Sequence, residues 1–423
     1  MSELIESANG ASTDVRLPVG VQCADVDRAP HNSRLRYIDA LRAIAALLVV
    51  WLHVGESYVQ LDPVGANGHW LYAFAQSIDV GRIGVVAFFL ISGFVIPFSI
   101  RADRPAPIST FAIKRFLRIY PAYWLSLPLG VLTTYWLWGR HFSVGDFLVN
   151  LTLLQDFFGV QAAQGLYWTL LVELVFYVLC IGLLLTRSLH DMRRVCALAI
   201  AFGLVHALAM IAHWLGRPLM SSTTAFWCLN LSIMLCGTLY RTCVIEGRAR
   251  RDPWLRVGFG GLLAFYLAVY PIATTWAVGF ERNAAISYAL GLLLFIAGTS
   301  GVRIATRVTD WLGQISYSVY LFHPVIFQPL LWWLLQQPTG SWWRTRHLGI
   351  YLLVNMLLTI AFASVVYRFV EKPCIDLGHR YSRKWAARKA DRHVVVPVAT
   401  QPAVATAAGG IGSRRKGDGG PGT

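Results

Sequence analysis

The stretch RYIDALRAIAALLVVWLHVGESYVQ, residues 36–60, decides how the rest of the chain is interpreted. It carries Asp39 and Arg42 in its first turns, an uninterrupted apolar run over 43–52, and then His53. An apolar helix of this length spans a membrane, and an ionisable group at membrane depth costs roughly 3 kcal/mol to insert. We therefore expect these charged groups to belong to a functional site.

The spacing of these groups supports that expectation. Arg42 and His53 are eleven positions apart, close to three helical turns, so their side chains leave one helix face roughly 16 Å apart. Asp39 lies three residues before Arg42, within pairing range. Neutral imidazole is the usual general base near pH 7, and a buried arginine requires an anion, either Asp39 or a ligand phosphate.

Composition indicates a polytopic membrane protein. Of its 423 residues 56% are hydrophobic and only 14% are charged, which soluble domains do not combine. The formal net charge of +15 lies in the gaps between apolar segments and in the tail, so we interpret it as a topology signal and exclude nucleic acid as a partner. The scattered cysteines predict neither a disulfide framework nor a metal site.

The sequence therefore predicts an all-α polytopic membrane protein with about ten transmembrane helices, both termini cytoplasmic, in the cell inner (plasma) membrane. The Lys and Arg excess falls on alternate loops, as an even number of spans requires. The predicted spans are 37–60, 80–100, 117–138, 165–186, 195–215, 223–243, 256–278, 284–302, 312–336 and 347–370.

Three regions follow from this pattern. Residues 1–35 are predicted to be a disordered cytoplasmic extension, 36–373 the membrane domain, and 374–423 a basic, then low-complexity cytoplasmic tail. The long connections 61–79 and 139–164 are predicted to be outside, where they either contact a substrate or serve only as connectors.

The segment KRFLRIYPAYW, residues 114–124, is the second constellation of interest. Lys114 and Arg118 are four residues apart and share a helix face at the membrane surface, with Arg115 beside them. They are either a positive-inside anchor or a clamp for a polyanionic cytosolic ligand, because arginine forks suit phosphate.

Single polar groups in other spans complete the candidate site. Glu173 is the only acid in its apolar run, and Ser92, Tyr320 and His323 come from FFLISGF and SYSVYLFHP. Small residues such as Ser92 also serve close helix packing. Glu371, in FVEKP, is interpreted as a helix-end anchor.

An ordered set of motifs resembles the membrane-bound acyltransferase-3 family. The set is IDALRA with a later His, FFLISGF, RFLRIYPAYW, YWTLLVELVFY, ISYSVYLFHP and VEKP, over 36–373. The resemblance implies a ten-helix domain that moves an acyl group, usually acetyl, from cytosolic acyl-CoA to a hydroxyl of a sugar, often an extracytoplasmic glycan. Acyl-CoA would be a donor substrate, with no permanently bound cofactor.

The same resemblance assigns roles to residues. It implies that Arg42 and His53 are the family's paired arginine and histidine, that Arg115 and Arg118 are its basic motif, and that Glu173 is its intramembrane acid. Lys114 stands where many members have arginine. We expect no SGNH-type esterase domain after the last span, so acceptor selection would rest with the membrane domain or a separate protein.

The expected mechanism keeps the nucleotide of acyl-CoA near Arg115, Arg118 and Arg42, with the pantetheine arm reaching His53. His53 would deprotonate the acceptor hydroxyl or be acylated itself, and Glu173 would orient it. Oxyanion donors are sought among Ser92, Ser316 and Tyr320, and we place Ser92, Tyr320 and His323 with Asp39 and Lys114 in substrate binding. The acceptor is a glycan or lipid-linked sugar.

Two other readings stay open. A small lipophilic acceptor, such as a macrolide, would use the same chemistry. A proton-coupled secondary transporter also uses intramembrane His, Arg and Glu, but it is expected to show inverted repeats, which the two halves of this sequence do not. A scaffolding protein would leave the buried charges without a purpose.

Overall fold

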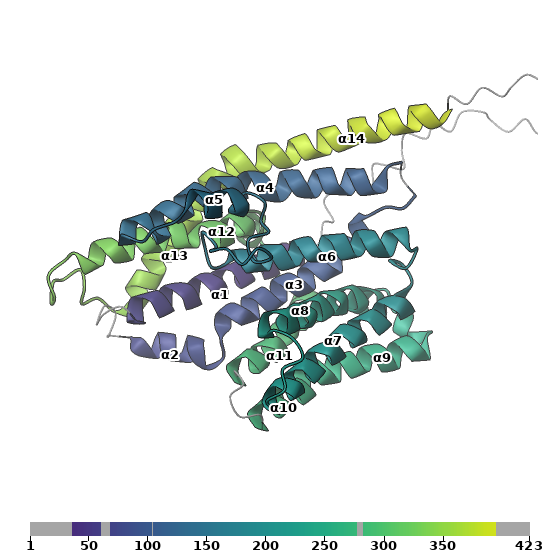
Figure 1. The fold of residues 1–423 in the computed structure, drawn as a ribbon, viewed down its shortest axis with the longest axis horizontal. Coiled ribbons are helices and arrows are strands. Elements are labelled where there is room, and N and C mark those ends of the chain that lie inside the picture. The colour runs from purple at the N-terminus through teal and green to yellow at the C-terminus, as the bar shows by residue number, and fades with distance from the viewer. Residues whose placement is uncertain (1–35, 61–67, 104, 277–281, 395–423) are drawn as a thin grey trace, which may run out of the picture.

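The structure is a computed structural model that describes residues 36–60, 68–103, 105–276 and 282–394. Figure 1 shows an elongated helical bundle. Its α-helices are α1 (Arg36–Gln60), α2 (His69–Ser77), α3 (Val80–Ser99), α4 (Pro107–Thr134), α5 (Val144–Asn150), α6 (Tyr167–Leu185), α7 (Met192–Trp214), α8 (Ser222–Tyr240), α9 (Pro253–Ala264), α10 (Tyr270–Trp276), α11 (Arg282–Ile296), α12 (Arg307–Leu335), α13 (Leu348–Val366) and α14 (Lys372–Val394). Short 3-10 segments are η2 (Trp136–Trp138) and η4 (Arg248–Arg250), and π-helical segments are η3 (Arg241–Ile245), η5 (Phe265–Val269), η6 (Ala297–Gly301) and η7 (Tyr367–Glu371).

The prediction of an all-α polytopic membrane protein is confirmed. In the described part of the chain, nine helices are long and apolar enough to cross a membrane, and they coincide with nine of the ten predicted spans. The remaining predicted span, 117–138, corresponds to α4. This helix has 28 residues, but Lys114, Arg115 and Arg118 fall in its first half, and it is not among the nine.

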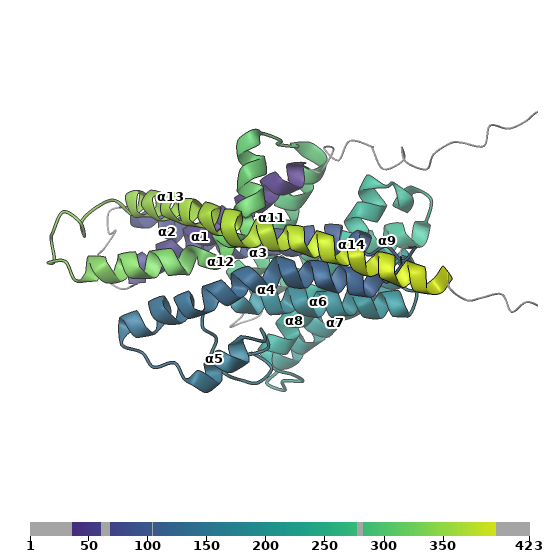
Figure 2. The ribbon, with the colours of Figure 1, turned by 90° about the horizontal axis from the view of Figure 1, so that it is seen from above.

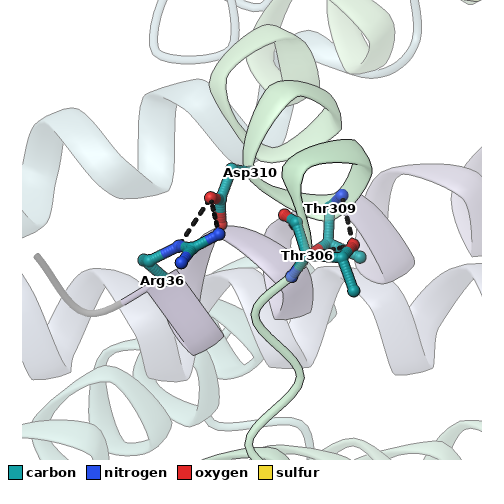
Figure 3. A network of polar contacts seen from close by, with 4 residues as sticks. All are labelled: Arg36, Thr306, Thr309 and Asp310. Atoms are coloured by element: carbon teal, nitrogen blue, oxygen red, sulfur yellow. Dashed lines mark hydrogen bonds and ion pairs between the residues drawn. The ribbon is translucent and has the colours of Figure 1, made fainter.

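Helix α1 lies at the centre of the bundle and packs most extensively against α12 and α3. Arg36 at the start of α1 pairs with Asp310 at the start of α12, with 2.6 Å between the Arg36 Nε and Asp310 Oδ2 atoms (Figure 3). Thr306 and Thr309 form a capping box that begins α12 beside this pair. The two helices therefore start at the same end and run parallel.

Close helix contacts rest on glycine, as expected where helices pack in a membrane. A β-carbon at Gly313 of α12 would lie 2.2 Å from the carbonyl oxygen of Asp39 in α1, and one at Gly84 of α3 would lie 2.4 Å from that of Ala45. Gly93 of α3 meets the backbone of Met234 in α8 in the same way. The expectation that small residues of FFLISGF serve close helix packing is confirmed at Gly93.

The last helices form a layer at one side of the bundle. In Figures 1 and 2, α14 runs beside α4, and these helices pack along their length. The backbone at Lys114 contacts Gly378 of α14. Residues 374–394, predicted as the basic part of the tail, are thus helical and attached to α4. The predicted N-terminal extension 1–35 and the tail beyond residue 394 lie outside the described residues.

Candidate active site

A cavity of about 560 Å³ lies at the end of the bundle where α1 ends and α3, α6 and α11 begin. Helix α2, from the predicted outside connection 61–79, closes one side with Tyr72 and Gln76. The polar and aromatic side chains that line the remaining wall include His53, Glu56, Asp79, Arg82, Trp168 and Asn283. The other long connection, 139–164, contributes no lining residue. The cavity therefore combines charged groups with an aromatic ring.

One ion pair is fixed in the cavity wall at the start of α3. Asp79 has a left-handed backbone conformation (φ 44°) and its Oδ1 accepts a hydrogen bond from the backbone N–H of Arg82 at 3.0 Å. Its Oδ2 lies 2.8 Å from Arg82 Nε. Because the same carboxylate caps the helix and holds the guanidinium, the Arg82 side chain is held at the cavity.

His53 enters the cavity wall from α1, and His323 of α12 lies beside it. The two rings are stacked, with centroids 5.3 Å apart and an interplanar angle of 23°. His323 is only 1% exposed, and its Nδ1 lies 2.7 Å from the carbonyl oxygen of Tyr320. A carbonyl only accepts, so Nδ1 carries the hydrogen and Nε2 holds a lone pair. We predicted His323 as a substrate-binding residue, but it lies outside the cavity lining.

Tyr320, the second predicted residue of α12, does line the cavity. Its hydroxyl donates to the carbonyl oxygen of Leu166 at 3.2 Å and lies 2.6 Å from the hydroxyl of Thr169. The ring meets Phe88 edge to face. The hydroxyl is thus engaged with α6, which fixes the position of Tyr320 beside His53.

Arg42 lies at the opposite end of α1, inside a group of charged residues. Four charged residues act on it electrostatically, namely Arg118, Asp39, Glu371 and Glu173. These residues come from α4, α1, η7 and α6, so four segments converge on one guanidinium. The structure therefore brings together Asp39, Arg42 and Arg118, as predicted, and adds Glu173 and Glu371.

Glu173 belongs to this Arg42 group and not to His53. Its Oε1 accepts hydrogen bonds from the hydroxyls of Tyr177 (2.6 Å) and Ser92 (3.4 Å). Gly81 of α3 packs on Leu52 and Gly84 on Ala45, so α3 runs antiparallel to α1 and Ser92 lies beside its first turns. The carboxylates that act on His53 are instead Glu56 and Asp79. Glu173 therefore does not orient His53 in this structure, contrary to the expectation. Ser92 lies far from His53, and so from any oxyanion that would form there.

Glu371 was interpreted as a helix-end anchor, and the structure corrects this. The side chain is 1% exposed, and its Oε2 accepts a hydrogen bond from Ser318 of α12 at 2.7 Å. Its Oε1 is buried with no hydrogen-bond partner in the described part of the chain. The π-helical segment η7 places this residue inward, at a point where sequence predicts only a helix end.

The three basic residues of α4 point to different neighbours. Arg115 donates from Nη2 to the Ser99 hydroxyl at 3.2 Å, and its guanidinium lies 5.4 Å from the ring centroids of both Phe111 and Tyr177. Lys114 lies on the α14 side, and Arg118 acts on Arg42 and Glu371. Arg115 and Arg118 thus face the end of α3 and the Arg42 group.

Sequence reasoning missed Glu56, Asp79 and Arg82. Glu56 is three residues after His53, and Asp79 and Arg82 form an acid–base pair at i,i+3 just where a span begins. Both signals were present in the sequence, but such charges also mark ordinary span ends.

Comparison with known proteins finds one matching family model and several related proteins. Residues 35–368 match a family model described as an acyltransferase domain. Nodulation protein 10 of Rhizobium leguminosarum bv. viciae is 27% identical over 80% of this chain and 93% of its own length. Acyltransferase MdmB of Streptomyces mycarofaciens is 25% identical over 82% and 93% of the two chains, and a candidate peptidoglycan O-acetyltransferase, YrhL of Bacillus subtilis (strain 168), is 24% identical over 84% and 57%. No solved structure matches the chain.

Proposed function

The chain belongs to this acyltransferase family, and from that premise we propose that it moves an acyl group, usually acetyl, from cytosolic acyl-CoA to a sugar hydroxyl. It is a multi-pass membrane acyltransferase. In our proposal it resides in the cell inner (plasma) membrane with both termini cytoplasmic. The cavity then faces away from the cytosol and receives a glycan or lipid-linked sugar.

The observation that carries this proposal is the position of His53. It lies in the wall of the cavity, whereas the Arg42 group lies at the other end of the same helix. Eleven residues of α1 separate the two side chains by roughly 16 Å, which a pantetheine arm can span. One helix thereby holds a general base near an acceptor site and a cation near the cytosolic surface.

The donor end of this arrangement is suited to phosphate. Acyl-CoA cannot cross the bilayer as a polyanion, so its nucleotide stays at the cytosolic end near Arg115 and Arg118, with Arg42 further in. Arginine binds phosphate through paired N–H donors. Asp39, Glu173 and Glu371 balance these cations, so that the group is not an uncompensated charge when the donor is absent.

The acceptor end is suited to a sugar. Hydroxyl groups need hydrogen-bond partners, which Glu56, Asp79 and Arg82 supply, and Trp168 offers an aromatic face. The volume of about 560 Å³ holds a small part of a glycan. The name of the Bacillus subtilis relative, a candidate peptidoglycan O-acetyltransferase, supports a glycan acceptor and acetyl as the acyl group.

The chemistry needs one proton transfer in each direction. His53 removes the proton of the acceptor hydroxyl, the oxygen bonds to the thioester carbonyl carbon, and the carbon–sulfur bond breaks. The proton then passes from His53 to the CoA thiolate, which leaves an ester and free CoA. Acylation of His53 itself, followed by transfer to the hydroxyl, gives the same products.

Mass spectrometry of cell-surface glycans tests the proposal. Cells would carry the wild-type chain, His53→Ala, His213→Ala or no chain, at matched protein levels. His213 is an exposed histidine of α7 and serves as the control. An acyl mass increment with wild type and His213→Ala only would support transfer to a glycan. An increment that is equal in His53→Ala, or absent with wild type despite folded protein and acyl-CoA, would refute it.

A further inference from the structure

A second pair of arginines lies at the end of the bundle where α1 begins, outside every motif discussed above. Arg241, the first residue of η3, has its guanidinium 4.0 Å from the ring centroid of Phe98, and its Nη1 donates to the carbonyl oxygen of Phe94 at 3.2 Å. Arg115 donates to Ser99, the next residue after Phe98. Arg115 and Arg241 therefore both contact the last turn of α3.

A network of hydrogen bonds links Arg303 to Tyr240, the residue before Arg241. Its Nε donates to the carbonyl oxygen of Thr299 at 2.8 Å, and the Thr299 hydroxyl donates to the Tyr240 hydroxyl at 3.0 Å. Tyr240 also bonds to the Ser300 hydroxyl and directly precedes Arg241. The end of α8 is thus tied to η6; Arg241 begins η3 directly after Tyr240, and Arg303 lies two residues after the end of η6.

Tyr37 of α1 interacts with both arginines of this pair. The Arg303 guanidinium lies over its ring, 5.2 Å from the centroid, and both Arg303 and Arg241 act on Tyr37 electrostatically. Tyr37 is two residues before Asp39 in the same helix. The Arg241–Arg303 pair therefore lies at the start of α1, the end of the helix that also carries Asp39 and Arg42.

The charge of the pair is only partly balanced in the described residues. Arg241 lies 3.6 Å from Glu246, but the same carboxylate also serves Arg248 at 3.7 Å. Arg303 has a carbonyl oxygen and an aromatic ring as partners and no carboxylate within 4.0 Å in the described chain. An arginine that only marks the cytosolic side needs no fixed geometry. Two arginines held by carbonyls and rings form instead a prepared anion site.

Acyl-CoA has two separate anionic parts, a pyrophosphate and a 3′-phosphate on the ribose. We propose that the Arg241–Arg303 pair binds the ribose 3′-phosphate, while Arg115 and Arg118 of α4 bind the pyrophosphate. This assignment rests on the proposed function, because it requires acyl-CoA as the donor. A phosphate monoester suits guanidinium groups, each with paired N–H donors, and both arginines act on the same residue, Tyr37.

The test compares acetyl-CoA with 3′-dephospho-acetyl-CoA as donors for the purified, membrane-reconstituted full chain. KM for each donor is measured in wild type and in Arg241→Gln/Arg303→Gln. The control is Arg187→Gln/Arg250→Gln, which removes two other exposed arginines at the same end of the bundle. We expect wild type and the control to prefer acetyl-CoA by about tenfold or more, and the Arg241/Arg303 variant to use both donors equally.

The variant Arg241→Lys/Arg303→Lys keeps the charge and guards against a folding defect. We expect it to retain part of the preference for acetyl-CoA. The subsite is refuted if wild type does not distinguish the two donors, or if the Gln variant distinguishes them as wild type does. Loss of the preference in Arg115→Gln/Arg118→Gln alone would also overturn the assignment. A wild-type protein that uses neither donor would refute the proposed function itself, which is a different result.

Discussion

His53 and His323 stack with their ring centroids 5.3 Å apart, although 269 intervening positions separate α1 from this part of α12. The parallel packing of the two helices, set by Arg36 with Asp310 and by Gly313 with Asp39, brings the rings to the same level. Only His53 reaches the cavity. One imidazole is thus available to substrate, and a second, hydrogen-bonded to Tyr320, supports it from behind.

Replacement of His53 by alanine removes the proposed general base. We expect the turnover rate to fall by about 100-fold or more, because positioned proton transfer contributes a factor of that size. Protein level, membrane insertion and thermal stability should stay close to wild type, since His53 lines a cavity and does not fill the core. Single-turnover transfer with acetyl-CoA measures the effect, and a near-normal rate would contradict the assignment.

His323 acts on His53 by packing, in our interpretation. His323→Phe keeps a flat ring behind His53, so we expect activity within a few-fold of wild type and an unchanged acid limb in the pH–rate profile. His323→Ala leaves a void beside His53 and should lower the turnover rate by about tenfold or more, with a loss of stability. If the Phe variant is as inactive as His53→Ala, the nitrogens of His323 are needed and the packing role is wrong.

The separation of the two ends predicts separate kinetic effects. Glu173→Gln weakens the group around Arg42 and should raise KM for acyl-CoA with little change in KM for the acceptor. Glu56→Gln alters the cavity and should raise KM for the acceptor with little change in KM for acyl-CoA. Each variant serves as the control for the other. An equal rise of both constants in either variant would show that the donor and acceptor sites are not distinct.

Much of this architecture could be predicted from the sequence because its signals are local. Apolar length identifies spans, and the 3.6-residue period places Arg42 and His53 on one face of α1. The neighbours of each residue could not be predicted in the same way. Glu173 was assigned to His53, yet the antiparallel packing of α3 on α1 places it with Arg42. Contacts between helices depend on register, which a single sequence does not state.

The π-helical segments are a second source of error. A π-helical turn inserts one residue and rotates the side chains that follow it. At η7 this rotation buries Glu371 against Ser318, where an α-helical pattern predicted an exposed helix end. Arg241 begins η3 and Arg303 lies two residues after η6, whereas the sequence presents both as ordinary span-end cations.

Glu371 should therefore matter for stability as well as for donor binding. Glu371→Ala leaves the buried Ser318 hydroxyl without its acceptor, at a cost of about 1–3 kcal/mol, and removes a negative charge beside Arg118 and Arg42. We expect a lower melting temperature in detergent, and a higher KM for acyl-CoA because Arg118 and Arg42 lose the carboxylate that positions them. Asp376→Ala, an exposed acid five residues further on, is the matched control and should change neither. Equal melting temperatures for the two variants would restore the interpretation of Glu371 as an anchor.

Gly313 links the fold to both ends of the site. A β-carbon at this position would lie 2.2 Å from the Asp39 carbonyl oxygen and 2.5 Å from its Cβ atom, so Gly313→Ala must push α12 away from α1. Overpacking of this kind costs about 1–3 kcal/mol. Because α1 carries Arg42 and His53 and α12 carries His323, we expect donor binding and turnover to fall together.

Gly260→Ala is the control for this substitution. Gly260 lies in α9, and a β-carbon there would meet nothing within 4 Å, so alanine should be neutral or stabilise the helix by up to about 1 kcal/mol. Thermal unfolding and acetyl transfer would be measured for both variants. If Gly313→Ala unfolds and reacts like Gly260→Ala, the close packing of α1 on α12 does not hold the two ends of the site in register.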